Sequence, residues 1–165
     1  MLERTIRKLK DGVEDGIPEP DPVLEISVDG YIPDDYIADP RYKLELYRRF
    51  AGLDYGEKDD LLDEIIDRFG EPPEEVEVLW RVACLRALCR LLHIRGISVK
   101  PGELRITFAE NAAIDPTALM KLISEQQQYM NFKSGVQAQL IFRTVKLKTD
   151  SLTWLEKNLP RLAFD

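Results

Sequence analysis

The chain has 165 residues, of which 44% are hydrophobic and 32% are charged, and it carries a formal net charge of −7. This composition is typical of one globular domain with a hydrophobic core, and it excludes a chain that is disordered along its whole length. No apolar run is long enough to cross a bilayer, and residues 1–8 are too charged to be the apolar centre of a signal peptide. We therefore expect a cytoplasmic protein.

The charged residues are unevenly distributed along the chain. Residues 1–80 hold 23 acidic and 10 basic side chains, a net charge of −13, whereas residues 81–165 hold 7 acidic and 13 basic ones, a net charge of +6. Two interpretations are open. Either the halves neutralise each other within the fold, or the acidic half is a surface for a basic partner and the basic half a weakly basic surface for nucleic acid.

Residues 1–22 are predicted to lie apart from the main domain. Leu2, Ile6 and Leu9 recur at helical spacing, and the stretch that follows is acidic and rich in glycine and proline. Such a stretch neither continues a helix nor belongs in a core, so we interpret it as an extended linker after a terminal helix. A frayed N-terminus is the alternative interpretation. The domain itself is expected to span residues 23–165.

The next part of the chain predicts a strand followed by a helix. Residues 23–28 alternate largely between apolar and polar side chains, the pattern of a half-buried strand, and Asp29-Gly30 ends this strand. Asp39-Pro40 is a helix-start signal, and the helix that it opens is closed by Gly52.

Two further helices follow, separated by a stop signal. The first spans residues 58–69, and its predicted core face consists of five apolar residues at helical spacing: Leu61, Leu62, Ile65, Ile66 and Phe69. Gly70 suits the left-handed position after a helix, and Pro72-Pro73 prevents continuation and opens the next helix. That helix runs from about residue 74 to 92 and is apolar around most of its circumference, so we expect it to be central and largely buried.

After residue 92 the apolar period changes from helical to strand-like. The predicted elements are strands at 94–99 and 104–108, a short helix from Asp115, strands at 129–132 and 136–142, and a last helix from Asp150. The fold class is therefore predicted to be α+β: N-terminal helices followed by a small, mainly antiparallel sheet with two further helices.

Three segments carry a resemblance to a known family. They are Tyr31–Ile37 (YIPDDYI), Arg41–Ala51 (RYKLELYRRFA) and Asp63–Gly70 (DEIIDRFG). In this order they resemble the C-terminal module of bacterial transcription-repair coupling factor (Mfd), whose members have IPDDYI, LYRR and ELIDRFG. The resemblance spans nearly the whole chain, is strongest between Tyr31 and Gly70, and after Val99 is only a pattern of strands and helices.

The resemblance implies a regulatory role in nucleotide excision repair. In coupling factors the C-terminal module folds back onto an N-terminal module that otherwise recruits UvrA, the damage-recognition protein, and so keeps the factor autoinhibited until its motor engages stalled RNA polymerase on DNA. Residues 1–22 would then be the tail helix of that upstream motor module plus a linker. ATP hydrolysis and DNA translocation belong to the motor, and we do not expect them of this chain.

No segment carries a catalytic or cofactor-binding motif. The sequence lacks a GxxxxGK[ST] phosphate loop, an HExxH zinc motif, a GxSxG elbow and paired CxxC motifs, and His93 is its only histidine. Cys84 and Cys89 lie roughly 140° apart around a predicted helix, so we expect two packed thiols and no disulfide. Glu64 and Asp67 are close enough to share a magnesium ion, but no concave site or partner group accompanies them. We expect no enzymatic activity, no cofactor and no metal site.

The candidate partner-binding residues lie on the outer side of the helix at residues 58–69. They are Asp60, Asp63, Glu64, Asp67 and Arg68, and Glu64 and Asp67 are predicted to project outward as adjacent carboxylates. We expect these residues to dock on a basic surface of the N-terminal module of the same parent chain. A local ion pair between Glu64 and Arg68 is the simpler interpretation.

Two other classes of function stay open. An auxiliary DNA-binding module would use cations of the second half that can follow a phosphate backbone: Arg81, Arg86, Arg90, Arg95, Lys100 and Arg105. A scaffolding module, which only stabilises the end of a motor protein, would need a large apolar face. Strong salt dependence of binding would distinguish the DNA-binding module from both other functions.

Overall fold

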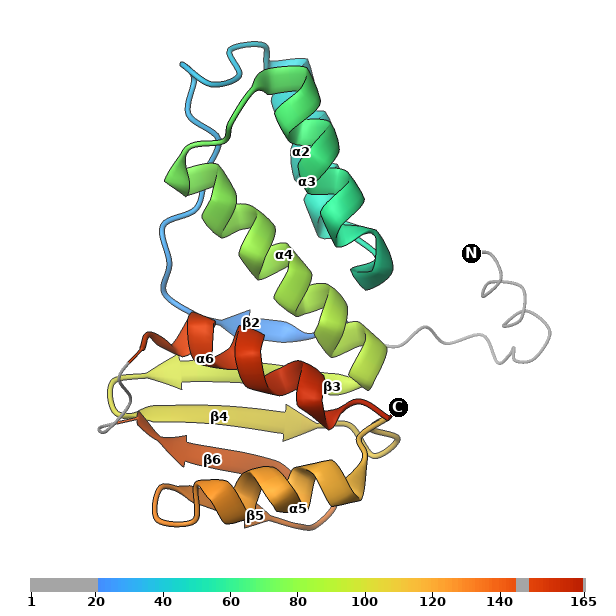
Figure 1. Ribbon diagram of the computed structural model, residues 1–165, viewed down its shortest axis with the longest axis vertical. Helices are drawn as coiled ribbons and strands as arrows, with labels where there is room; N and C mark the ends of the chain where they lie inside the picture. Colours follow the sequence, from blue (N-terminus) through green and yellow to red (C-terminus); the bar gives the residue numbers. More distant parts are fainter. Residues whose placement is uncertain (1–20, 145–148, 165) are drawn as a thin grey trace, which may run out of the picture.

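In the computed structural model, three helices stand on one edge of a five-stranded sheet (Figure 1). The structure describes residues 21–144 and 149–164. The predicted terminal helix and nearly all of the predicted linker lie outside the described residues, so the division of the chain at residue 22 stays a prediction.

The sheet consists almost wholly of antiparallel strands. Its strands are β2 (Val23–Glu25), β3 (Ile94–Lys100), β4 (Glu103–Phe108), β5 (Met130–Lys133) and β6 (Gln139–Arg143), in the spatial order β2-β3-β4-β6-β5. Only β2 runs parallel to its neighbour, β3. Together with the helices, this mainly antiparallel sheet confirms the predicted α+β class.

The described α-helices are α2 (Pro40–Ala51), α3 (Lys58–Phe69), α4 (Glu74–Leu92), α5 (Pro116–Glu125) and α6 (Ser151–Asn158). Three of them begin after an aspartate, as predicted, because its carboxylate accepts a hydrogen bond from a backbone N–H of the first turn. The three N–H to carboxylate distances are 2.9 Å at Asp39, 3.0 Å at Asp115 and 2.7 Å at Asp150. Gly70 ends α3 with a φ of +91°, which confirms the need for glycine at that stop signal.

Helix α4 takes part in two hydrophobic clusters. Val76 and Ala83 belong to a cluster with apolar residues of α2, α3 and the loop before α2. Leu85, Leu88 and Cys89 belong to a second cluster with the sheet, α5 and α6. Because its apolar residues face both ways, α4 is largely buried, as its sequence predicted.

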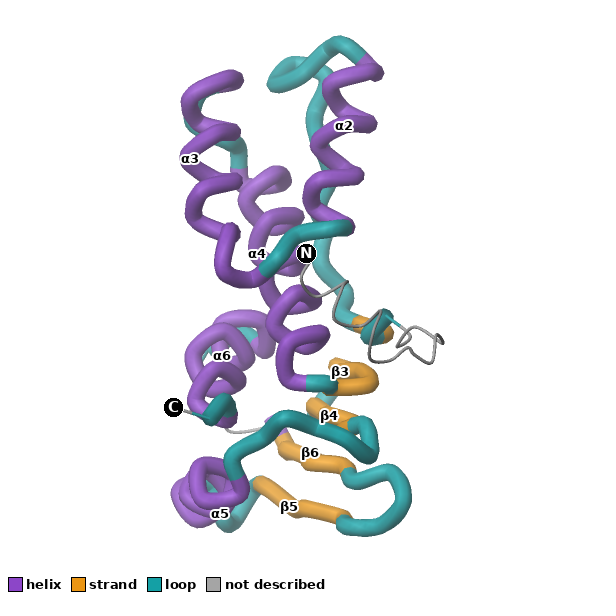
Figure 2. The backbone as a smooth tube through the Cα atoms, turned by 90° about the vertical axis from the view of Figure 1, so that its right-hand side faces the viewer, coloured by secondary structure: helices purple, strands orange, loops and turns teal. Residues whose placement is uncertain are grey.

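Helices α5 and α6 lie on the same side of the sheet (Figure 2). On that side Leu104 and Ile106 of β4 and Leu140 of β6 are at most 1% exposed. The residues that alternate with them, such as Arg105 and Thr107, lie on the opposite face because successive side chains of a strand point to opposite sides.

Strand β2 extends the sheet at its edge and is shorter than the predicted strand at residues 23–28. Its three residues pair with Gly96, Ile97 and Ser98 of β3. The chain then runs beside α4 up to α2 (Figure 1). The two strands approach so closely that a Cβ at position 96 would lie 2.9 Å from the carbonyl oxygen of Val23. Glycine at this position therefore permits the parallel pairing.

Gly96→Ala is expected to lower the free energy of unfolding by about 1–3 kcal/mol, because the added methyl group forces β2 and β3 apart. Gly56→Ala is the matched control: a Cβ there meets nothing within 4 Å, so its effect is expected to stay within about 0.5 kcal/mol. Urea unfolding followed by circular dichroism measures both. Equal midpoints for Gly96→Ala and the unmodified chain would contradict the close contact.

Candidate partner-binding site on the helical unit

The three family-like segments converge on one hydrophobic cluster, which forms the helical unit of α2, α3 and the first half of α4. Ile32 and Ile37 of the loop before α2 are buried in this cluster together with Leu61 and Ile65 of α3. The Tyr36 hydroxyl donates a hydrogen bond to the carbonyl oxygen of Gly70 at 2.6 Å. The loop is thereby fastened to the end of α3.

The same loop is fastened to α2. The backbone N–H of Ile32 donates to the Tyr47 hydroxyl at 3.0 Å, and the Lys43 ammonium pairs with Asp34. At the N-terminal end of α3, the Trp80 indole N–H of α4 donates to the carbonyl oxygen of Lys58 at 2.8 Å. Helix α3 is therefore held at both ends, which fixes the backbone from which its charged side chains project.

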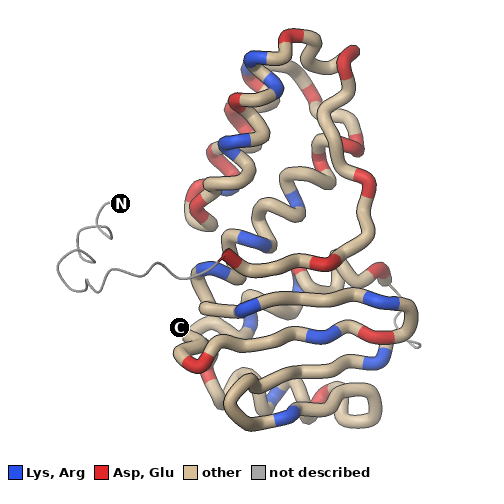
Figure 3. The backbone as a smooth tube through the Cα atoms, turned by 180° about the vertical axis from the view of Figure 1, so that it is seen from behind, with Lys and Arg blue, Asp and Glu red and all other residues tan. Residues whose placement is uncertain are grey.

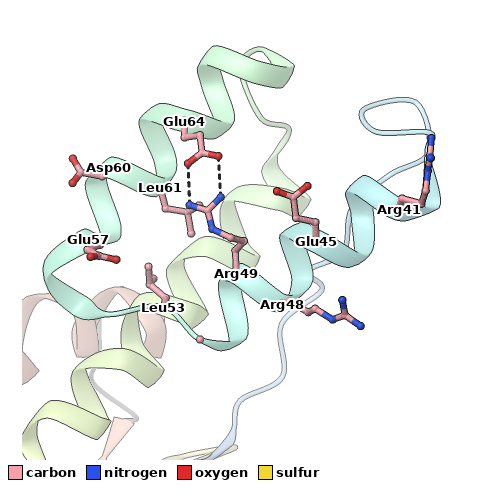
Figure 4. A pocket seen from close by; sticks show the side chains of 10 residues that line it. Arg41, Glu45, Arg48, Arg49, Leu53, Glu57, Asp60, Leu61 and Glu64 are labelled. Atoms are coloured by element: carbon pink, nitrogen blue, oxygen red, sulfur yellow. Dashed lines mark hydrogen bonds and ion pairs between the residues drawn. The ribbon is translucent and has the colours of Figure 1, made fainter. Parts of the chain in front are cut away.

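Glu64 faces α2, whereas the sequence predicted that it projects outward beside Asp67. Its two oxygens accept hydrogen bonds from Arg49 of α2 at 2.8 and 2.9 Å (Figure 4). The predicted ion pair with Arg68 is also present, at the longer distance of 3.3 Å. Hydrogen bonding by Arg49 and its charge, assisted by Arg68, lower the pKa of Glu64 to about 2. Glu64 thus stays ionised and joins α2 to α3.

Arg68 is likewise engaged within the helical unit. Its guanidinium contacts Glu45 of α2 at 3.2 Å as well as Glu64. It also lies over the rings of Phe69 and Tyr42, 4.8 and 5.8 Å from their centroids. Glu45, Arg49, Glu64 and Arg68 therefore form one ion cluster across the two helices.

The three aspartates of the predicted set have a different environment. Asp60, Asp63 and Asp67 are exposed, and none of them forms an ion pair within residues 21–144 and 149–164. Their spacing of three and four residues places them on one strip of α3. We call this strip the aspartate ridge. It is the part of the predicted site that forms no ion pair within the described residues.

An open groove of about 480 Å³ lies beside the ridge, between α2 and α3. Arg49 and Glu64 lie at its centre, and Asp60 points away from this pair (Figure 4). The groove wall carries cations from α2, such as Arg48, and carboxylates from the start of α3 and the turn before it, such as Glu57. Such a surface can receive charged side chains of another protein.

The described residues form neither a metal-binding cluster nor an activated thiol. They contain no group of three or more His, Cys, Asp or Glu side chains that could hold a metal ion. Cys84 and Cys89 are free and buried, as predicted, and burial raises the pKa of each thiol to about 12. Neither thiol is therefore an activated nucleophile. No described helix is both long and apolar enough to cross a membrane.

Three of the six cations considered for DNA binding are used inside the domain. Arg81 pairs with Glu156 at 2.7 Å, and Arg105 pairs with Glu103 at 3.1 Å. Arg90 contacts Asp21 at 3.0 Å and donates to the backbone carbonyls of Ala51, the last residue of α2, and Leu53, in the turn after it. Among the described residues, the Arg90–Asp21 pair is the one ion pair between the acidic and basic halves. Direct ion pairing between the acidic half and the basic half of the sequence therefore involves few of the described charged residues.

Glu64→Gln is expected to destabilise the domain by about 0.5–1 kcal/mol at pH 7, a small loss because the ion pair is partly exposed. The pKa of Glu64 is lowered on folding, so the ionised carboxylate stabilises the fold above about pH 4.5, and this stabilisation is lost as the pH falls toward 2. Urea unfolding between pH 7 and 2.5 should show the difference from the unmodified chain shrinking over that range. Asp67→Asn is the control: it removes no ion pair of the described residues, so its stability at pH 7 should equal that of the unmodified chain. A stability difference for Glu64→Gln that does not change with pH would show that the ionised Glu64 carboxylate does not stabilise the fold.

Comparisons with known proteins match the part of the chain that contains the three family-like segments. The family model described as the TRCF domain matches residues 26–119. The transcription-repair-coupling factor of Bacillus subtilis is 37% identical over 102 residues, which cover 60% of this chain and 9% of that protein. The Escherichia coli protein of the same name is 27% identical over 166 residues, 98% of this chain and 14% of that protein. The chain therefore spans only a small part of these relatives.

A solved structure shows the same fold. The crystal structure of the C-terminal domain of transcription-repair coupling factor superposes with a TM-score of 0.69 at 24% identity, and the match covers 86% of this chain and 94% of that one. The family model itself covers more than half of the chain, including α2, α3, α4 and the ion cluster. The chain belongs to the TRCF-domain family.

Proposed function

We propose that this domain is a regulatory clamp of a transcription-repair coupling factor. It docks reversibly on the N-terminal, UvrA-recruiting module of its parent chain and keeps the factor autoinhibited during nucleotide excision repair. The clamp opens when the upstream ATP-dependent motor engages stalled RNA polymerase on DNA. The observation that carries this proposal is the aspartate ridge, three exposed carboxylates without ion-pair partners among the described residues, fixed on a helix that is held at both ends.

The polar character of the ridge suits a contact that must open. A switch between two states works with a coupling free energy of roughly 1–3 kcal/mol, and tethering within one chain raises the effective concentration of the partner to the millimolar range. Charge pairs at the rim of an interface give specificity and fast association without a large buried apolar area. A few aspartates facing arginines or lysines therefore suffice to hold the clamp closed.

The five predicted residues divide into two roles in this proposal. Asp60, Asp63 and Asp67 contact the basic partner surface. Glu64 and Arg68 position the ridge, because the ion cluster fixes α3 against α2. A charge reversal at Glu64 would place a lysine beside Arg49 and Arg68, so it would disturb the helical unit as well as the contact. The clean test therefore uses the ridge alone.

In the full-length parent protein, Asp63→Lys combined with Asp67→Lys is expected to raise the affinity for UvrA about 5- to 150-fold in the absence of RNA polymerase, because the repelled clamp exposes the recruiting surface. Titration calorimetry with purified UvrA measures this change. The matched control is Asp29→Lys combined with Glu110→Lys, which changes the net charge equally at exposed positions off α3.

The thermal unfolding of both variants establishes that the domain still folds. A folded ridge variant with the affinity of the unmodified protein would leave the aspartates as a solvated helix face and favour a scaffolding role. An equal rise in the control variant would show that net charge, and not the ridge, governs UvrA access.

A further inference from the structure

The sheet has one face that the described helices leave uncovered. Helices α5 and α6 lie together on the other side (Figure 2), and the view from behind shows the five strands without a described helix across them (Figure 3). The alternation of β4 agrees, since Leu104 and Ile106 are buried whereas Arg105 and Thr107 are partly exposed. The strand register then fixes which residues share the uncovered face.

Four cations share this face. Lys100, Arg105, Arg143 and Lys133 come from β3, β4, β6 and β5 respectively. Lys100 and Arg143 both pair with Glu103 in the register, Arg105 lies two residues from Glu103 on β4, and Lys133 lies beside Gln139. We call these four residues the cationic sheet face.

The cations are only partly neutralised by neighbours. Glu103 pairs with Arg105, and Glu25 of β2, which pairs with Ser98 in the register, is a second carboxylate on this face. Within the described part of the chain, Lys100, Lys133 and Arg143 form no ion pair with a carboxylate, and all three are exposed. The face therefore presents three cations without a carboxylate partner among the described residues, one each from β3, β5 and β6.

The remaining residues of the face favour the phosphate backbone of a nucleic acid, rather than the surface of another protein, as its ligand. Between the cations lie neutral hydrogen-bonding side chains, among them Ser98, Thr107, Asn131 and Gln139. Protein interfaces concentrate their binding energy in apolar and aromatic anchors near the centre. On this face the large apolar residues of the described strands are Ile141 of β6 and, at the edge of the sheet, Val23 of β2. Phosphate contacts, in contrast, use lysine, arginine and neutral polar side chains.

We propose that the cationic sheet face binds the phosphate backbone of duplex nucleic acid without sequence preference. Single strands are usually held by stacking bases on aromatic side chains, and the aromatic residues of β4, β5 and β6 lie on the covered side, where Phe108, Phe132 and Phe142 belong to the hydrophobic cluster. The acidic helices stand away from this face at the far end of the molecule (Figure 1), so their charge does not block its approach to a duplex. This inference concerns a different surface from the clamp and does not depend on it.

The test is fluorescence anisotropy of a labelled 24-base-pair DNA duplex titrated with the full 165-residue chain at several salt concentrations. Three neutralised phosphates predict that log Kobs falls with log [salt] with a slope of about −2.7. Lys100→Gln combined with Lys133→Gln is expected to make this slope less steep by about 2 and to weaken binding at 50 mM salt at least tenfold. A parallel titration with duplex RNA tells which nucleic acid is preferred.

The matched control is Lys121→Gln combined with Lys157→Gln, which removes two exposed lysines from α5 and α6 on the covered side. This variant should keep the slope and most of the affinity. Binding lost equally in both double variants, or no binding at 25 mM salt and 200 µM protein, would overturn the proposal.

A further variant separates duplex binding from occupation of the face by the chain itself. Glu14→Gln, Asp15→Asn and Glu19→Gln together neutralise the acidic segment that precedes β2. If only this variant binds the duplex, the proposal is overturned in favour of that segment as the occupant. If binding is similar with and without these substitutions, the duplex is the occupant.

Discussion

The packing of α4 between two hydrophobic clusters is the constraint on which the rest of the domain depends. A helix normally buries one face, but α4 buries residues toward the helical unit and toward the sheet. Fully burying a leucine stabilises a fold by about 1.5–3 kcal/mol, and Leu85, Leu88 and Leu92 are each at most 3% exposed. The position of α2 and α3 relative to the sheet is therefore set by one shared element.

The charged residues of the domain fall into three groups with different surroundings, and composition alone does not distinguish these groups. Some, such as Arg49 and Glu64, connect neighbouring elements and belong to the architecture. A second group, the aspartate ridge, is exposed on α3 and forms no ion pair among the described residues. A third group lies on the open sheet face, far from the ridge. The same residue types thus connect elements in one place and lie exposed without an ion pair in another, and only their surroundings distinguish them.

Much of the fold could be predicted from the sequence because its signals are local. The apolar spacing of α3, the stop at Gly70 and the helix-opening aspartates each depend on a few neighbouring residues. The pairing of β2 with β3 could not be predicted in this way, since about 70 residues separate the partners. The local signal for it was Gly96, an isolated glycine within a strand pattern, which indicates a close backbone approach.

The candidate site shows the same limit. Periodicity identified the outer residues of α3, and the i,i+4 spacing predicted the Glu64–Arg68 pair, which is present. Arg49 was missed because it lies fifteen residues before Glu64 and meets it only once α2 and α3 lie side by side. The segment that carries it, LYRRF, held the only available signal, an arginine pair on the helix preceding the acidic one.

The attachment of β2 has a mechanical consequence. The described chain enters the sheet through Asp21, which is held by Arg90 near the end of α4, and then through a strand of only three residues. Tension applied to the chain before Asp21 is therefore borne first by that ion pair and by the short β2–β3 ladder. The ion pair is made to α4 and the ladder to β3, and these two elements connect the sheet to the helical unit. A pull at this point therefore acts first on the junction between the sheet and the helical unit.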